Sequence, residues 1–118
     1  HYDDIILTKN GYVSECSSSN IFWIKNGNIY TSRKNCGIYP GHIREKIINS
    51  DFEIKFLDAK IEEIINSDEV FLTNSNIMVK AISAVMFNNN SHKKESLITR
   101  KIISYIEEDL KNYCQNYG

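Results

Sequence analysis

An α+β domain is the fold class that this 118-residue sequence predicts. Short apolar runs separated by Asn-Gly turns fill the first quarter of the chain, which is typical of antiparallel strands. Segments with apolar residues every three or four positions follow, as expected of amphipathic helices. Because the length suits one hydrophobic core and no linker-like stretch divides it, we expect residues 1–118 to form a single domain.

The first 31 residues predict four short strands in a meander. The strands are expected at residues 4–8, 12–15, 20–25 and 28–31. Asn10-Gly11 and Asn26-Gly27 separate two pairs of these runs. Both dipeptides tolerate the positive φ that tight hairpin turns require.

The remainder of the chain alternates between helices and strands. Helices are expected at residues 42–49, 59–66 and 95–113, strands at 52–57, 69–73 and 77–86, and an exposed turn at 88–91. In the strand at 52–57, Phe52, Ile54 and Phe56 are expected to share one face. The last helix is expected to bury a single apolar stripe. That stripe consists of Leu97, Ile98, Ile102, Tyr105, Ile106 and Leu110.

Composition excludes several classes of partner. Fourteen Lys and Arg against 15 Asp and Glu leave a net charge of -1, so no global attraction to nucleic acid or to an anionic membrane is expected. No apolar run approaches the ~20 residues that span a bilayer. The three cysteines lack disulfide or metal-ligand spacing, and the histidines show none either, so we expect a cytoplasmic protein without a metal site.

The polar segment Glu15-Cys16-Ser17-Ser18-Ser19-Asn20-Ile21-Phe22 carries the strongest functional signal. Alone, it is typical of a loop whose Ser and Asn side chains bind backbone groups. It is followed, however, by Ile29-Tyr30-Thr31, by Gly41-His42-Ile43-Arg44 and by Glu69 to Ser75. This ordered set resembles the class IV aminotransferase family, which includes branched-chain aminotransferases, D-amino acid aminotransferases and aminodeoxychorismate lyases.

The resemblance implies the C-terminal domain of the D-amino acid aminotransferase-like, fold-type IV enzymes, with a mixed, barrel-like sheet and flanking helices. It implies pyridoxal 5'-phosphate as the cofactor, a small amino-acid-like substrate, and a homodimer for the full-length enzyme. The chain is then expected to be the cofactor-binding domain of a longer enzyme whose N-terminal part is missing.

The resemblance also carries cofactor-binding roles over to ten positions. These are Glu15, Ser19, Asn20, Gly41, His42, Ile43, Arg44, Asn74, Ser75 and Asn76. Glu15 is expected to face the pyridine nitrogen and keep it protonated. Residues 41–43 are expected to form a phosphate cup at a helix start, and residues 74–76 a second wall. His42 and Ile43 replace the small aliphatic and hydroxyl residues usual in the family, which leaves the phosphate one hydroxyl donor fewer.

The family's Schiff-base lysine is expected upstream of Glu15, beyond the 14 residues that precede it here. Lys9 lies in a turn and is expected to be a solvated surface lysine. We therefore expect no catalytic residue in this chain, and no turnover by the chain alone.

Among family activities, the sequence favours aminodeoxychorismate lyase, which converts 4-amino-4-deoxychorismate to 4-aminobenzoate and pyruvate. Residues 17–23 and 72–75, together with Ile43, are similar to that branch. A branched-chain or D-amino acid aminotransferase is the alternative. An alternative of another class is a non-catalytic module that binds a phosphorylated ligand or a protein partner.

Overall fold

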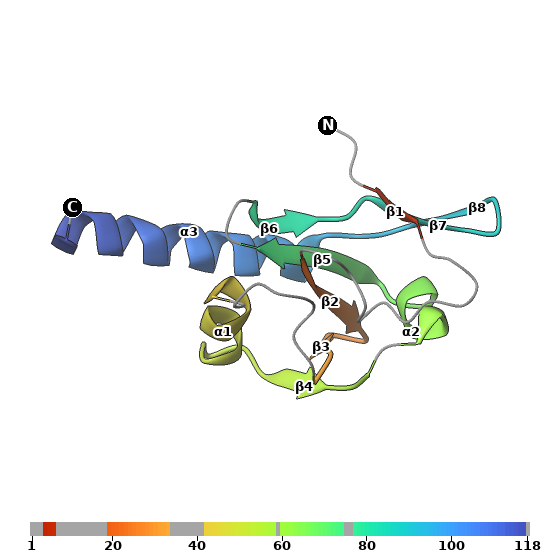
Figure 1. The fold of residues 1–118 in the computed structure, drawn as a ribbon, viewed down its shortest axis with the longest axis horizontal. Helices are drawn as coiled ribbons and strands as arrows, with labels where there is room; N and C mark the ends of the chain where they lie inside the picture. Colours follow the sequence, from red (N-terminus) through yellow and green to blue (C-terminus); the bar gives the residue numbers. More distant parts are fainter. Residues whose placement is uncertain (1–3, 7–18, 34–41, 59, 75–76, 118) are drawn as a thin grey trace.

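A computed structural model describes residues 4–6, 19–33, 42–58, 60–74 and 77–117. The strands in these ranges are β1 (Asp4–Ile6), β2 (Asn20–Lys25), β3 (Asn28–Thr31), β4 (Ile54–Phe56), β5 (Glu69–Asn74), β6 (Met78–Ala81), β7 (Ala84–Phe87) and β8 (Asn90–Lys93). The helices are α1 (His42–Ile48), α2 (Ile61–Ile65) and α3 (Leu97–Tyr117). The predicted α+β class is confirmed (Figure 1).

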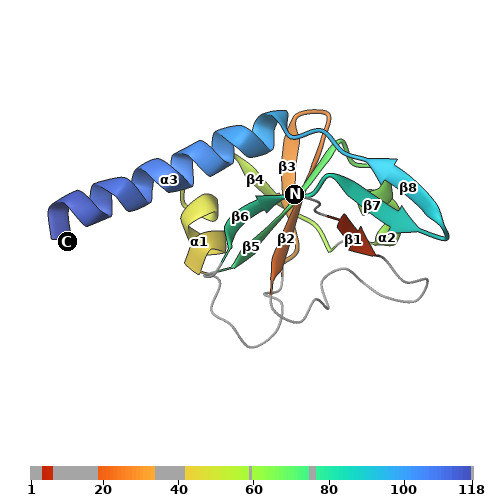
Figure 2. The same cartoon turned by 90° about the horizontal axis from the view of Figure 1, so that it is seen from above.

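The described strands form two sheets. The five-stranded sheet has the order β4-β3-β2-β5-β6, and all its neighbours are antiparallel except β3 and β4. The three-stranded sheet has the order β1-β7-β8, with β1 parallel to β7. Helix α3 runs alongside the five-stranded sheet, and its C-terminal half extends beyond both sheets (Figures 1 and 2).

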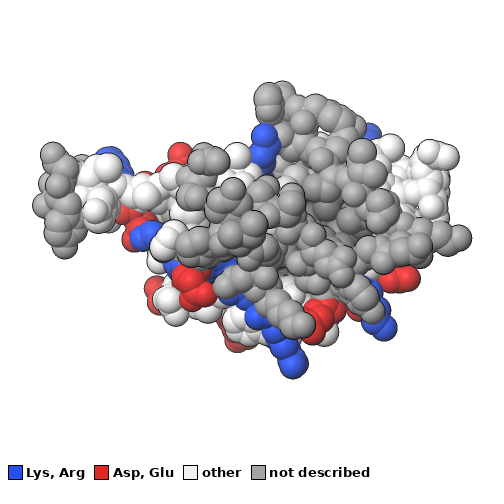
Figure 3. Space-filling view, viewed as in Figure 1, with Lys and Arg blue, Asp and Glu red and all other residues white. Residues whose placement is uncertain are grey.

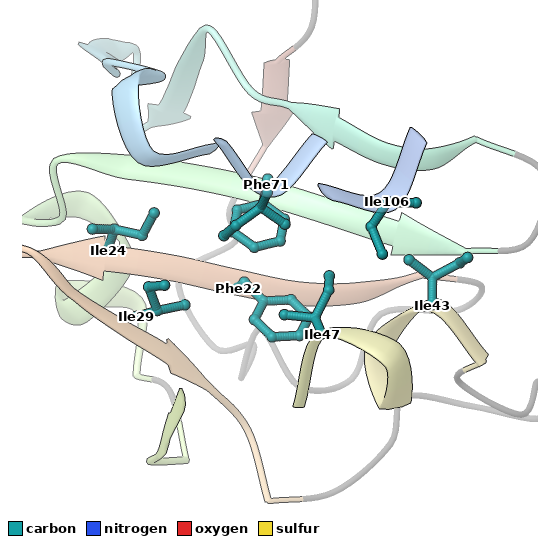
Figure 4. Packing of buried hydrophobic residues seen from close by; sticks show 8 residues of the cluster. Phe22, Ile24, Ile29, Ile43, Ile47, Phe71 and Ile106 are labelled. Atoms are coloured by element: carbon teal, nitrogen blue, oxygen red, sulfur yellow. The ribbon is translucent and has the colours of Figure 1, made fainter. Parts of the chain in front are cut away.

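The five-stranded sheet is buried on both faces. On one face, Phe22 and Ile24 of β2 pack with isoleucines of α1 and α3 (Figure 4). On the other face, Ile21 and Trp23 of β2 pack with residues of α2 and β7. Because successive side chains of a strand point to opposite faces, a central strand covered on both sides must be apolar throughout. This requirement explains the unbroken run Ile21–Ile24.

The Asn26-Gly27 hairpin forms as predicted. Strands β2 and β3 pair with Lys25 opposite Asn28, which leaves a two-residue loop. Asn26 has a φ of 51° and Gly27 a φ of 78°, so both loop residues occupy the left-handed region that such a turn requires. The strands expected at residues 20–25 and 28–31 have the predicted bounds.

The predicted four-stranded meander is wrong for its first strand. β1 pairs with β7, with Ile5 opposite Val85, and so lies in the other sheet. Residues 7–8 and the return strand expected at 12–15 lie outside the described residues. The apolar pattern of a short strand indicates that it is buried, but it does not indicate which strand pairs with it.

The single strand predicted at residues 77–86 is also wrong. The chain forms β6 against β5, breaks at Ile82 and Ser83, and continues as β7 in the three-stranded sheet. Ile82 is buried with the α2-facing cluster and its amide donates to the carbonyl of Val70. The apolar residues before and after the break belong to different sheets, and the sequence pattern does not indicate where the chain passes from one sheet to the other.

Strand β8 was not predicted. Asn88 and Asn89 have φ values of 50° and 64° and form a tight turn, after which Asn90–Lys93 pairs with β7. Of the turn expected at residues 88–91, only Asn88 and Asn89 lie in the turn, because residues 90 and 91 belong to β8. β8 is a polar, mostly exposed edge strand, so it lacks the apolar alternation by which half-buried strands are recognised.

Helix α3 begins two residues later than expected and continues to Tyr117. Ile102 and Ile106 are buried in the core, which confirms the centre of the predicted stripe. Leu97 is 65% exposed, so its place in that stripe was wrong. The strand expected at residues 52–57 is shorter, Ile54–Phe56, and Phe56 is 43% exposed on this edge strand.

Candidate functional site

Polar residues gather where three strands of the five-stranded sheet begin or end. Asn20 at the start of β2 lies opposite Thr73 near the end of β5, and Phe22 lies opposite Thr31 at the end of β3. We call this the polar edge, formed by Ser19, Asn20, Thr31, Ser32, Thr73 and Asn74. Four of its members, Asn20, Thr31, Ser32 and Thr73, are buried. Buried polar side chains normally have hydrogen-bond partners, so the partners of these residues show which polar groups the protein itself holds in place.

Two residues predicted for the cofactor site meet here. The amide nitrogen Nδ2 of Asn74 donates to Ser19 Oγ over 2.9 Å. The carbonyl Oδ1 of Asn74 accepts the backbone amide of Ile77 over 2.8 Å. Both polar groups of the Asn74 side chain are therefore held, and this side chain joins the start of β2 to the turn that follows β5.

Helix α1 brings the next predicted residues to the same part of the fold. The helix begins at His42, whose side chain is exposed, and packs against β5. The Ile43 side chain is buried in the core close to Ile106 (Figure 4). Any contact that Ile43 makes with a ligand must therefore come from its backbone.

Arg44 is buried in the first turn of α1. Its side chain is 5% exposed, and Nη2 donates to the carbonyl oxygen of Ser32 over 2.6 Å. The guanidinium also lies over the ring of Phe56, 5.8 Å from the ring centroid. The hydrogen bond joins α1 to the chain just beyond β3.

Two buried side-chain atoms in the described residues have no hydrogen-bond partner, Arg44 Nε and Thr73 Oγ1. An unsatisfied buried polar group costs about 1–3 kcal/mol, so each one needs a reason. Both residues belong to elements that border the polar edge. Sequence reasoning did not select Thr73, although a threonine ending the apolar run of residues 69–73 just before Asn74 was a usable signal.

Four predicted site residues, Glu15, Gly41, Ser75 and Asn76, lie outside the described residues. Their roles stay predictions. Among the described residues, Asn74 bonds to Ser19 at the polar edge, and Arg44 of α1 bonds to Ser32 of the same edge.

A pocket of about 260 Å³ lies elsewhere on the five-stranded sheet. It is lined by Trp23, Lys25, Tyr30, Leu57, Glu62, Glu63 and Asn66. Trp23 and Tyr30 stack there with ring centroids 5.9 Å apart, on the face that α2 covers. None of the predicted site residues lines this pocket.

Lys94 is the residue with a marked pKa shift among those described. Burial lowers its pKa to about 8, while the nearby carboxylate of Asp68 opposes that change. Its ammonium donates to the carbonyl oxygens of Ile65 and Ser67 over 2.8 and 2.6 Å. Lys94 thus links the end of α2 to the segment before α3, away from the polar edge.

Other kinds of site were sought in the described part of the chain. No group of His, Cys, Asp and Glu side chains there is arranged to hold a metal ion. Among the described helices, none is both long and apolar enough to cross a bilayer. On the face in Figure 3, the described acidic and basic side chains are interspersed.

Comparison with known proteins gives the same family. The profile of the class IV amino-transferases matches residues 1–85. A Thermotoga maritima protein named as a branched-chain-amino-acid aminotransferase is 28% identical over 98% of this chain and 44% of its own length. The aminodeoxychorismate lyase of Bacillus subtilis is 28% identical over 98% of this chain and 41% of its own length.

A solved structure has the same fold. The structure described as a 4-amino-4-deoxychorismate lyase of Legionella pneumophila matches with a TM-score of 0.65 and 27% identity, over 78% of this chain and 35% of that one. The chain spans about two-fifths of the length of the curated relatives above. Because the family profile covers most of the sequence and the fold agrees, the chain belongs to the class IV aminotransferase family.

Proposed function

We propose that this chain is the cofactor-binding part of a pyridoxal 5'-phosphate enzyme of the aminodeoxychorismate lyase type. The full-length enzyme converts 4-amino-4-deoxychorismate to 4-aminobenzoate and pyruvate. In the same proposal it acts as a cytoplasmic homodimer on a small, amino-acid-like substrate. Membership of the family supports this proposal, together with the similarity to a lyase over nearly the whole chain.

The observation that carries the proposal is the polar edge. Asn20 lies opposite Thr73, and Asn74 bonds to Ser19, so two distant segments of the motif are brought together. The hydroxyl of Thr73 and the Nε of Arg44, both buried and without hydrogen-bond partners among the described residues, border the same edge. Polar side chains are therefore concentrated where the family resemblance expects the cofactor.

Pyridoxal phosphate, when bound, supplies a ring that withdraws electrons from a substrate carbanion. The protein's contribution is to bind and orient it. Glu15 is the proposed partner of the pyridine nitrogen, where a carboxylate favours the protonated ring. The backbone of residues 41–43 and the segment 74–76 are the proposed phosphate ligands. Asn74 is held at both ends of its side chain, so it positions that second segment.

A branched-chain or D-amino acid aminotransferase is the second candidate. The branched-chain-amino-acid aminotransferase relative matches this chain at 28% identity, the same value as the lyase. The polar edge serves either activity, because both begin with the same cofactor and an amino-acid-like substrate.

Two experiments separate these proposals. Calorimetric titration with pyridoxamine 5'-phosphate tests the site, and the amine form avoids nonspecific reaction with surface lysines. We expect saturable binding that Asn74→Ala weakens, whereas the exposed control Asn66→Ala leaves it unchanged. The full-length enzyme is then supplied with 4-amino-4-deoxychorismate, and release of pyruvate with 4-aminobenzoate identifies the lyase.

Amino-group transfer between a branched-chain or D-amino acid and 2-oxoglutarate, without pyruvate release from 4-amino-4-deoxychorismate, would favour the aminotransferase instead. A full-length protein that binds pyridoxamine phosphate but catalyses neither reaction would favour the non-catalytic module. Absence of binding in the full-length protein would contradict the cofactor proposal itself.

A further inference from the structure

The pocket on the α2-covered face of the five-stranded sheet has an aromatic wall. Trp23 of β2 lies opposite Tyr30 of β3, and their rings stack with an angle of 15° between the ring planes. Trp23 is buried whereas Tyr30 is partly exposed, so Tyr30 presents the accessible ring. Leu57, which follows β4, is 40% exposed and lines the same pocket. An accessible aromatic ring beside an aliphatic side chain favours a ligand with a flat apolar body.

Charged side chains of both signs also line this pocket. Glu62 and Glu63 line it from the first turn of α2, and Lys25 lines it from the end of β2. Because alternate residues of a strand point to the same face, Lys25 shares the face of Trp23. Oε2 of Glu63 accepts the backbone amide of Lys60 over 2.8 Å, which holds this carboxylate at the start of the helix. The pocket therefore offers acceptors for a cation from α2 and a donor for an anion from β2.

The ion pair that Lys25 makes with Asp68 is weak. Nζ of Lys25 lies 3.8 Å from Oδ1 of Asp68, which is longer than a hydrogen bond, and both side chains are nearly half exposed. An exposed pair of this kind contributes little to stability. The other oxygen of Asp68 accepts the backbone amide of Asn26 over 2.9 Å, so Asp68 stays anchored when the Lys25 ammonium turns towards a ligand.

The volume of the pocket limits the size of the ligand. Pockets for drug-sized molecules commonly have volumes of about 300–1,000 Å³. A pocket of about 260 Å³ therefore suits a smaller molecule. A free α-amino acid with an aromatic side chain is such a molecule, and its ammonium, its carboxylate and its flat ring each match one feature of the lining.

We infer that this pocket is a second small-molecule site, which takes a free aromatic α-amino acid. The ring of the ligand packs on Tyr30 and Leu57, its ammonium binds the carboxylate of Glu62, and its carboxylate binds the ammonium of Lys25. The inference goes beyond the proposed function and does not depend on it, because the residues that line the pocket belong neither to the polar edge nor to the predicted cofactor ligands.

Four probes separate the contributions of the ring and of the two charges. L-Phenylalanine has all three groups, 2-phenylethylamine lacks the carboxylate, 3-phenylpropionate lacks the ammonium, and L-alanine lacks the ring. Each probe is titrated into the full-length protein in the presence of pyridoxamine 5'-phosphate. Binding is followed by NMR through the indole N–H signal of Trp23, which the substitution Trp23→Phe assigns. Thermal unfolding of each variant without ligand reports any loss of fold.

We expect L-phenylalanine to bind saturably and the other three probes to bind about threefold or more weakly, because each of them lacks one contact. Lys25→Met should weaken binding of L-phenylalanine about threefold without weakening that of 2-phenylethylamine, which has no carboxylate to lose. Glu62→Gln should weaken binding of L-phenylalanine without weakening that of 3-phenylpropionate. The controls Lys101→Met and Glu53→Gln change exposed residues outside the pocket and should leave every affinity unchanged.

Equal binding of L-phenylalanine and 2-phenylethylamine would mean that Lys25 is not used, and the inference would be wrong. A Trp23 signal that L-phenylalanine does not shift would also overturn it. Loss of L-phenylalanine binding in Asn74→Ala would indicate that the amino acid binds at the polar edge, which contradicts a second site. Failure of the protein to bind pyridoxamine phosphate would contradict only the proposed function, because the Trp23 titration does not require the cofactor.

Discussion

Glu69 should be the most important single anchor of helix α3. Its side chain is on β5, only 3% of the residue is exposed, and its carboxylate faces the first turn of the helix. Oε2 accepts the amide of Ile98 over 3.0 Å, and Oε1 accepts the amide and the hydroxyl of Thr99, each over 2.8 Å. Backbone amides in a first turn have no partner within the helix, so this carboxylate caps α3 from a neighbouring strand.

The substitution Glu69→Gln keeps the shape and removes the charge. Hydrogen bonds to a charged group contribute about 1.5–3 kcal/mol, and a favourable partly buried charge at a helix end adds up to about 2 kcal/mol. The amide oxygen of glutamine retains part of these contacts, so we expect a loss of about 2–3 kcal/mol. For a domain of this size that corresponds to a fall of about 10 °C in the unfolding midpoint.

Thermal and urea unfolding followed by circular dichroism measure this change. Glu95→Gln is the matched control, since Glu95 is exposed and also lies just before α3. It should change stability by less than about 0.5 kcal/mol. Combining Glu69→Gln with Thr99→Val should cost less than the sum of the two single changes, because the substitutions share one hydrogen bond. A Glu69→Gln variant as stable as Glu95→Gln would refute the capping role.

Two further predictions concern buried polar groups. Thr31 Oγ1 donates to the carbonyl of Ile21 over 2.9 Å whereas Thr73 Oγ1 has no partner, so Thr31→Val should lower the free energy of unfolding by about 1–2 kcal/mol and Thr73→Val should leave it unchanged or raise it. Equal losses in urea unfolding would mean that Thr73 is satisfied. The pKa of Lys94 is lowered from 10.5 to about 8. Between these two pH values the unfolded chain binds more protons than the folded chain, so the free energy of unfolding should rise with pH across that range. Lys94→Met should flatten this rise, and an unaltered pH profile of unfolding would contradict the assignment.

Local signals in the sequence were sufficient for the hairpin and for the helix core. Asn26-Gly27 specifies its own turn through backbone conformation, without help from distant residues. Ile102 and Ile106 lie one helical turn apart and face the same core, so their spacing alone identified the buried face.

Features that depend on distant pairing could not be read from local pattern. The break at Ile82 and Ser83 exists because β6 and β7 belong to different sheets. The polar strand β8 exists because β7 offers it a free edge. Leu97 has the spacing of the core stripe but is the first residue of α3, and its side chain is exposed there.

Some features of the candidate site could likewise be predicted from the sequence, and others follow only from the fold. The motif residues Ser19 and Asn74 were selected from the sequence, and their hydrogen bond places them together. Thr73 was missed although its position just before Asn74 was a usable signal, and only the fold shows that its hydroxyl has no partner. For Arg44, the sequence selected the residue, whereas its burial and its bond to Ser32 follow only from the fold.

The central claim is that this chain forms the cofactor side of a pyridoxal-phosphate site in which Glu15 meets the ring nitrogen. The most direct measurement is calorimetric titration of the full-length protein with pyridoxamine 5'-phosphate, comparing wild type, Glu15→Gln and the exposed control Glu53→Gln. We predict saturable binding by wild type and Glu53→Gln, and affinity lower by about tenfold or more in Glu15→Gln, because a charge-assisted contact is lost. Equal affinity in all three proteins would contradict the role of Glu15, and no binding by wild type would contradict the cofactor site as a whole.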